Sequence, residues 1–286
     1  MNTKYSITFL IALYAFNTFS QENLILNKVN EQKILGTEFV DVNNIFRSTD
    51  PDYKLLRNAN DESNISFYTY DKSLFSRLGE AISINIPSNK GDISLELFHV
   101  PSAFYNYNIV TSDGKKIGAN QNIKHYRGVV KDKELSLAAF TFSEDEVIGL
   151  VATEEGNFNF ASISNEEKFV FFNENDIAVM DFSNPMQFEN DVADSQIKSY
   201  DPKVLSQESK LAINSSDKCV RFYFETEFDI FQNKGSVQNL ELFVTSLYNQ
   251  VAILYQNENI GTYISQIFVW NTTDPYTETN TLDLLN

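Results

Sequence analysis

Few side chains in this sequence have the chemistry of a catalytic or metal site. The chain contains only two histidines and one cysteine. His99 ends an alternating apolar segment and is expected to be a partly buried structural residue, and His125 is expected to have a packing or turn role. Glu225 and Glu227 alternate along one segment and would share a strand face. Two such carboxylates can act as general acid and base, but a solvated face is the simpler interpretation.

The first twenty residues have the features of a secretory signal peptide. Lys4 supplies a positive flank, residues 7–19 form an apolar run that is short for a bilayer span, and small residues precede Gln21. We therefore predict a signal peptide over residues 1–20, cleaved near Ser20, and a secreted mature chain. No other segment of the sequence is long and apolar enough to serve as a membrane anchor.

Cys219 is an unusual feature for an exported protein. Because it is the single cysteine, no disulfide can form within the printed sequence. Exported proteins seldom leave thiols free, so an odd cysteine suggests a partner elsewhere or a special role. A disulfide to a region that follows the printed sequence and an inert buried thiol are two open interpretations.

The overall charge argues against one class of partner. The 286 residues carry a formal net charge of -17, and 42% of them are hydrophobic, which is a globular composition. The acidic residues are spread along the chain without a basic stripe. Phosphate backbones and anionic membranes would be repelled, so the sequence argues against nucleic-acid binding.

Residues 21–183 have the pattern of an antiparallel β-rich domain. Residues 83–99 read as strand, turn, strand, and hairpin turns are expected at residues 113–114 and 155–156. Strands that recur at intervals of roughly ten residues are typical of an antiparallel sheet or sandwich. Residues 184–217 are polar and lack sustained periodicity, which predicts a linker that a protease can reach.

Beyond the linker the hydrophobic period changes from two to 3.6. Residues 219–228 read as a strand, apolar residues recur at helical spacing over residues 237–255, and residues 262–270 read as the next strand. Ser236 can cap the helix, and Gly261 is expected in the turn that follows it. A strand, helix and strand in this order predict a βαβ unit with parallel strands.

This βαβ unit is expected to be incomplete. Two strands and one helix leave most of the sheet's apolar faces uncovered, and residues 280–285 resemble the first turn of a further helix, with Asn280 or Thr281 as its cap. We therefore expect the chain to stop partway into a second domain. The predicted fold class is α+β: a β-rich domain followed by an incomplete α/β half-domain over residues 218–286.

Two stretches resemble a known family. Residues 219–276 resemble the start of the catalytic domain of reprolysin-like (adamalysin-like) zinc metalloproteases, which are metzincins. The likeness lies in the strand that ends at Glu227, a short turn to Phe231, the long amphipathic helix, and the second strand that ends at Trp270. Residues 125–160 are similar to the propeptide of that family, in a pattern formed by Tyr126, Gly128, Val130, Ser136, Gly149 and Leu150.

The resemblance implies a zinc-dependent endopeptidase, but its catalytic residues are absent from the printed sequence. The family binds zinc through an H-E-x-x-H-x-x-G-x-x-H run, whose glutamate activates the metal-bound water. Two separate histidines cannot supply three imidazole ligands, so no catalytic or metal residue is assigned and zinc is expected only in the full-length enzyme. Lys124 and Arg221 depart from family positions that carry a cysteine and a calcium-binding glutamate, so no calcium site is assigned either.

The leading hypothesis is therefore the N-terminal part of a secreted metalloprotease precursor, with a propeptide over residues 21–183 and an activating protease acting at the linker. Protein or peptide substrates belong to the full-length enzyme. In this setting Cys219 has a third interpretation, as a zymogen latch whose thiolate caps the zinc. The alternative hypothesis is a non-catalytic secreted β-rich binding or adhesion module.

Overall fold

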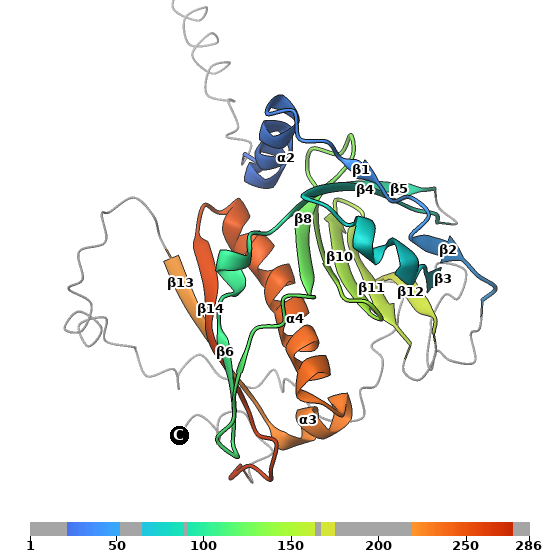
Figure 1. The fold of residues 1–286 in the computed structure, drawn as a ribbon. Helices are drawn as coiled ribbons and strands as arrows, with labels where there is room; N and C mark the ends of the chain where they lie inside the picture. Colours follow the sequence, from blue (N-terminus) through green and yellow to red (C-terminus); the bar gives the residue numbers. More distant parts are fainter. Residues whose placement is uncertain (1–21, 52–64, 89–90, 164–166, 175–218, 277–286) are drawn as a thin grey trace, which may run out of the picture.

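A computed structural model describes residues 22–51, 65–88, 91–163, 167–174 and 219–276. The predicted signal peptide, the predicted linker over residues 184–217 and the expected helical turn at residues 280–285 lie outside these described residues. Within them, the protein is α+β and rich in strands, with one large curled antiparallel sheet and one smaller sheet (Figure 1).

The large sheet has ten strands, which are antiparallel except where β1 pairs with β4. Its spatial order is β1-β4-β5-β8-β9-β10-β11-β12-β3-β2. The strands are β1 (Val40–Asp41), β2 (Phe46–Ser48), β3 (Ser66–Tyr70), β4 (Ala81–Ile86), β5 (Ile93–His99), β8 (Lys124–Val130), β9 (Leu137–Phe142), β10 (Val147–Thr153), β11 (Gly156–Ser162) and β12 (Phe169–Asn173). The predicted antiparallel sheet is confirmed.

The curl of this sheet encloses an aromatic core. Phe46 on β2 packs against Phe160 on β11 with ring centroids 4.3 Å apart, and both contact Phe140 on β9. Tyr68 and Tyr126 belong to the same buried cluster. Large rings bury much apolar area and pack edge to face, so this cluster holds strands that are distant in the sheet order close together.

Local turn signals in the sequence correspond to the observed hairpins. β4 and β5 pair antiparallel around the turn predicted within residues 83–99. β10 and β11 pair around Gly156, whose φ is +122°, and β6 (Asn108–Thr111) pairs with β7 (Lys116–Gly118) around Gly114, whose φ is +87°. Glycine adopts positive φ without steric cost, which explains why these turns could be located from sequence.

The smaller sheet joins two distant parts of the chain. Its order is β13-β14-β6-β7, where β13 (Cys219–Thr226) and β14 (Gly261–Val269) are parallel, as predicted. β6 pairs in parallel with β14 on the other side, with Ile109 opposite Ile267. The sequence predicted that further polypeptide must extend this βαβ unit. In the structure, the β6–β7 hairpin from the β-rich part of the chain provides two of the strands.

Two local predictions differ from the structure. Gly261 was expected in a turn but is the first residue of β14, since residues 258–260 complete the turn. Phe231 was expected in a short turn but lies in a helix, α3 (Phe228–Lys234), which ends at Gly235 with a φ of +74°. The 21-residue helix α4 (Val237–Asn257) begins where predicted, because the Ser236 side chain accepts a hydrogen bond from the backbone N–H of Asn239.

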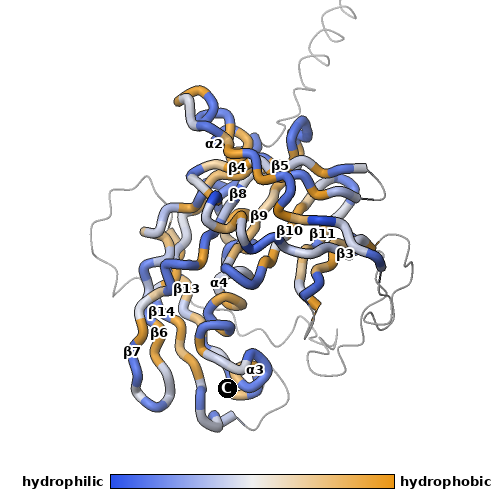
Figure 2. Tube along the Cα trace, turned by 45° about the vertical axis from the view of Figure 1, so that its right-hand side comes forward, coloured by the Kyte–Doolittle hydropathy of each residue, from blue (hydrophilic) through white to orange (hydrophobic). Residues whose placement is uncertain are grey.

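Helix α4 lies between the two sheets (Figure 1). Leu240, Tyr248 and Ala252 pack on β6 and β14 of the smaller sheet. Ile253 packs with Val29 of helix α2 (Leu24–Ile34) against the face of the large sheet opposite the aromatic core. Figure 2 shows apolar stretches along the strands of both sheets and a hydrophilic connection between β6 and β7.

The propeptide-like sequence pattern has a structural explanation in β8 and β9. The Tyr126 hydroxyl donates to the carbonyl of Gly79 (2.7 Å), and the Ser136 hydroxyl accepts from the backbone N–H of Val130 (2.9 Å). Gly128 faces β5 so closely that a Cβ there would lie 1.9 Å from the carbonyl oxygen of Glu96. A glycine is therefore required by packing where β5 pairs with β8.

Replacing Gly128 with alanine should destabilise the protein strongly. The added methyl group meets backbone atoms, which cannot move aside as a flexible side chain can, so we expect a loss of about 3 kcal/mol or more in the free energy of unfolding. The matched control is Gly118→Ala on β7, where an added Cβ meets nothing within 4 Å and the change should stay within about 0.5 kcal/mol. Urea denaturation measures both, and equal effects would contradict the proposed packing.

Candidate functional site

A buried polar cluster forms where α4 crosses β8 and β9. Asn249, which is fully buried, accepts hydrogen bonds through Oδ1 from the Tyr105 hydroxyl (3.1 Å) and from Nε of Arg127 (2.9 Å). Its Nδ2 donates to the backbone carbonyls of Tyr126 and Phe140, both at 3.2 Å. The side chain thus links the helix to two strands and to the short 3-10 helix η4 (Ser102–Tyr105).

His125 belongs to the same cluster. Its ring stacks on Tyr105 with centroids 3.6 Å apart and planes 6° from parallel, and its Nδ1 lies 3.0 Å from Oγ1 of Thr141. Burial lowers the pKa of His125 well below its ordinary value, with a smaller contribution from the Arg127 guanidinium. The ring is therefore neutral, which agrees with the packing role predicted for it.

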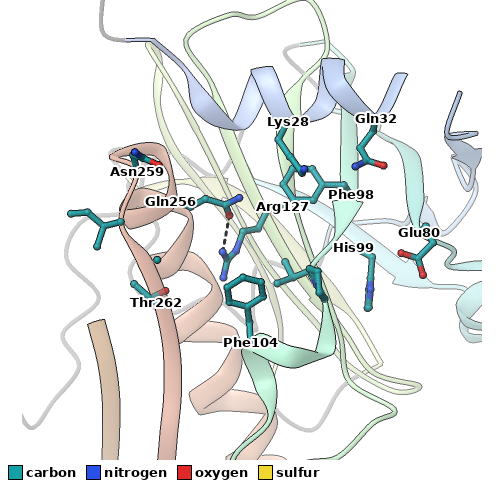
Figure 3. Close-up of a pocket in the computed structure, with 14 residues that line it drawn as sticks. Lys28, Gln32, Glu80, Phe98, His99, Phe104, Arg127, Gln256, Asn259 and Thr262 are labelled. Atoms are coloured by element: carbon teal, nitrogen blue, oxygen red, sulfur yellow. Dashed lines mark hydrogen bonds between the residues drawn. The ribbon is translucent and has the colours of Figure 1, made fainter. Parts of the chain in front are cut away.

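A pocket of about 480 Å³ lies next to this cluster. Figure 3 shows residues that line it from helix α2, the end of β5, β8, the end of α4 and the start of β14. Its apolar walls include Phe98, Val100, Phe104 and Ile260. Its volume is within the range that small-molecule sites occupy, roughly 300 to 1,000 Å³.

Arg127 is the charged residue deepest in this pocket. It is 4% exposed, and its Nη1 donates to Oε1 of Gln256 (2.8 Å), as the dashed line in Figure 3 marks. Its Nη2 is buried and has no hydrogen-bond partner among the residues that the structure describes. Within the described residues no carboxylate forms an ion pair with it. A buried cation that lacks a counter-ion is costly, on the order of several kcal/mol.

His99 lies in the wall of the same pocket. Its half-buried ring packs edge to face on Tyr126 with centroids 5.3 Å apart. Burial lowers its pKa, and the nearby carboxylate of Glu80 opposes that shift. The structural, partly buried position predicted for His99 is confirmed. The proximity of His99 to Arg127 could not be seen in the sequence, where the available signal was an arginine within strand 124–130.

Cys219 is the exposed first residue of β13 and a free thiol. The interpretation as an inert buried thiol is therefore wrong, because the side chain is open to solvent. The disulfide to another region and the zymogen latch both remain predictions.

Glu225 and Glu227 have different surroundings. The exposed Glu225 accepts hydrogen bonds from Nε1 of Trp270 (2.8 Å) and from the Tyr276 hydroxyl, and these donors lower its pKa. Glu227 lies one residue beyond β13 and precedes α3, and burial together with Asp229 raises its pKa. Glu227 directly follows the last residue of β13 in extended backbone, and the Glu225 carboxylate is among the charges that raise its pKa, so the two carboxylates lie near one another.

The residues present do not fit the zinc site of the resembled family. In the described part of the chain, no three His, Cys, Asp or Glu side chains lie close enough together to hold a metal ion. His125 is stacked on Tyr105 and lies within hydrogen-bond distance of Thr141, so its ring is already engaged in packing. No catalytic step is therefore assigned to these residues.

Comparisons with known proteins do not identify the chain. A scan against protein-family models gives no match, and neither does a search of curated proteins. Among the helices within the described ranges, none has the length and hydrophobicity of a membrane span.

Replacing Asn249 with alanine should weaken the attachment of α4 to the large sheet. The change leaves the Tyr105 hydroxyl, Nε of Arg127 and two backbone carbonyls without their partner, and we expect a loss of about 3 kcal/mol in the free energy of unfolding. The control is Asn239→Ala on the same helix, which removes an exposed hydrogen bond to the carbonyl of Lys234 and should cost less than about 1 kcal/mol. Similar losses in the two variants would argue against this role.

The neutral state of His125 should make the protein acid-sensitive. Its pKa in the folded state lies below the ordinary value of about 6.5, so the unfolded chain takes up a proton first and stability falls as the pH drops below that value. Between pH 7 and 5 this contribution should reach about 2 kcal/mol. His125→Asn should lower the free energy of unfolding at both pH values but make it depend less steeply on pH. His99→Asn, at a half-buried position, should reduce this pH dependence less. An unchanged pH dependence of the free energy of unfolding in the His125 variant would contradict this role of His125.

Proposed function

We propose that this chain is the N-terminal part of a secreted zinc metalloendopeptidase precursor. In this proposal residues 1–20 are the signal peptide, residues 21–183 the propeptide, residues 184–217 the linker and residues 218–286 the start of the protease domain. The main supporting observation is the unit formed by β13, α4 and β14, with parallel strands and a long amphipathic helix in the order expected from the resemblance.

The free edge of β13 is a second supporting observation. β13 is the last strand at its side of the smaller sheet in the described residues, and its Val220 and Tyr223 side chains are 38% and 53% exposed. An unpaired strand edge offers backbone donors and acceptors to a further strand. Additional strands of a protease domain would pair at this edge, opposite the edge of β14 that β6 occupies.

The proposal assigns the β-rich part a role as an intramolecular support. The β6–β7 hairpin extends the protease-like sheet, and β8 and β9 bind the other side of α4. A propeptide held this way would cover apolar surface of the first βαβ unit during folding. The zinc ligands would come from a part of the protein outside the printed sequence, which has only two histidines.

A non-catalytic secreted binding module is the second candidate. The observation that favours it is the pocket at Arg127, which draws residues from both the β-rich part and the βαβ unit. If this candidate holds, the two parts form one binding unit rather than a propeptide and a protease.

The reading frame beyond Asn286 distinguishes the two candidates. The precursor proposal predicts an H-E-x-x-H run within about 100 further residues, the range of one domain. The longer protein should then hydrolyse peptides once the linker is cleaved, and a zinc chelator should abolish that activity. The 286-residue chain serves as the inactive control. A stop codon directly after Asn286, or a continuation without the motif, contradicts the proposal.

A further inference from the structure

We propose that the pocket at Arg127 binds a carboxylate that is attached to an apolar group. This inference goes beyond the proposed function and does not depend on it, because the pocket is formed entirely by residues between Lys28 and Thr262. The ligand class follows from the charge, the hydrogen-bond capacity and the wall composition of the pocket.

The guanidinium of Arg127 has unused binding capacity. Nε and Nη1 donate to Asn249 and Gln256, whose amide oxygens carry no charge. Nη2 is buried and donates to no atom in the described part of the chain. The residue is 4% exposed, so water screens its charge poorly. An anion that accepts from Nη2 would satisfy the donor and compensate the charge at once.

The count of charges favours a carboxylate over a phosphate. Phosphate sites gather several cations or a helix N-terminus, whereas this pocket has one uncompensated cation. Lys28 at the rim already pairs with Glu31 at 2.7 Å, and Glu80 adds a negative charge to the lining. A single planar carboxylate matches the flat edge of one guanidinium and brings one negative charge.

The walls favour an apolar body on that carboxylate. Phe98, Val100 and Phe104 line the space beside the guanidinium, and Ile260 faces it from the α4–β14 connection. Figure 3 shows Arg127 between Lys28 and the ring of Phe104. The Phe104 side chain is 40% exposed although it is aromatic, so a ligand body packed on it would bury apolar surface.

Calorimetric titration of the 286-residue protein tests the ligand class. The probes are benzoate, phenylacetate and hexanoate, with benzamide and phenylacetamide as neutral counterparts of the first two and inorganic phosphate as a compact anion. We expect each acid to bind at least roughly tenfold more tightly than its amide and than phosphate. Peptides that end in phenylalanine with a free or an amidated C-terminus form a second arm. Tighter binding of the free peptide than of the small acids would identify a peptide terminus as the source of the carboxylate.

Gln256→Glu tests the role of Arg127 without removing it. The new carboxylate has the shape of the glutamine and would pair with Nη1 as an internal counter-ion. We expect affinity for the acids to fall roughly tenfold or more and the melting temperature of the free protein to rise by about 2–4 °C. Gln238→Glu makes the same chemical change in the exposed first turn of α4, outside the pocket, and should alter affinity by less than about threefold.

Three results would overturn the inference. Equal affinity for acids and amides would show that Arg127 is a structural arginine only. Preference for inorganic phosphate would reject the carboxylate assignment. Equal loss of affinity in Gln256→Glu and Gln238→Glu would show that overall charge, rather than contact with Arg127, controls binding.

Discussion

The structure depends on one helix that packs against two sheets at once. Helix α4 presents Leu240 and Tyr248 to the smaller sheet and Asn249 and Ile253 to the large sheet. Its 21 residues span roughly 32 Å, which lets it contact strands of both sheets along its length. Because most of its sides are in contact with protein, the polar groups on it must be satisfied internally. Asn249 does this with hydrogen bonds to Tyr105, Arg127, Thr141 and two strand carbonyls.

This arrangement also explains where the pocket lies. Helix α2, the end of β5 and the connection between α4 and β14 meet at one end of α4 (Figure 1). The pocket therefore depends on the same contacts that hold α4 in place. Its deepest charged group, Arg127, shares Asn249 with the helix, so the position of the guanidinium is coupled to the docking of α4. Fold and candidate site are thus stabilised by one hydrogen-bond network.

The sequence predicted the features that local patterns encode. The hairpins, the cap at Ser236, the long amphipathic helix and the parallel pairing of β13 with β14 all follow from turn residues, capping and periodicity over short stretches. The pairing of β6 with β14 could not be predicted in this way. These strands are separated by some 150 residues, and parallel pairing over such a distance has no turn that marks it. The βαβ unit was expected to be completed by residues later in the chain. In the structure, β6 and β7, which come earlier in the chain, extend its sheet.

The burial of Arg127 in the pocket could not be predicted for a related reason. The free-energy cost of burying its charge explains why this residue matters. In the sequence it is one of two charged residues in strand 124–130, with Lys124, and nothing local shows that α4 covers it. Once α4 docks, the guanidinium is buried, and its hydrogen-bond partners within the described ranges, Asn249 and Gln256, are neutral. A buried ion without a counter-ion costs free energy that a methionine of similar length would avoid, since replacing buried charges by apolar residues is often neutral or stabilising. The proposed binding of an anion would compensate this charge and so account for an arginine at this position.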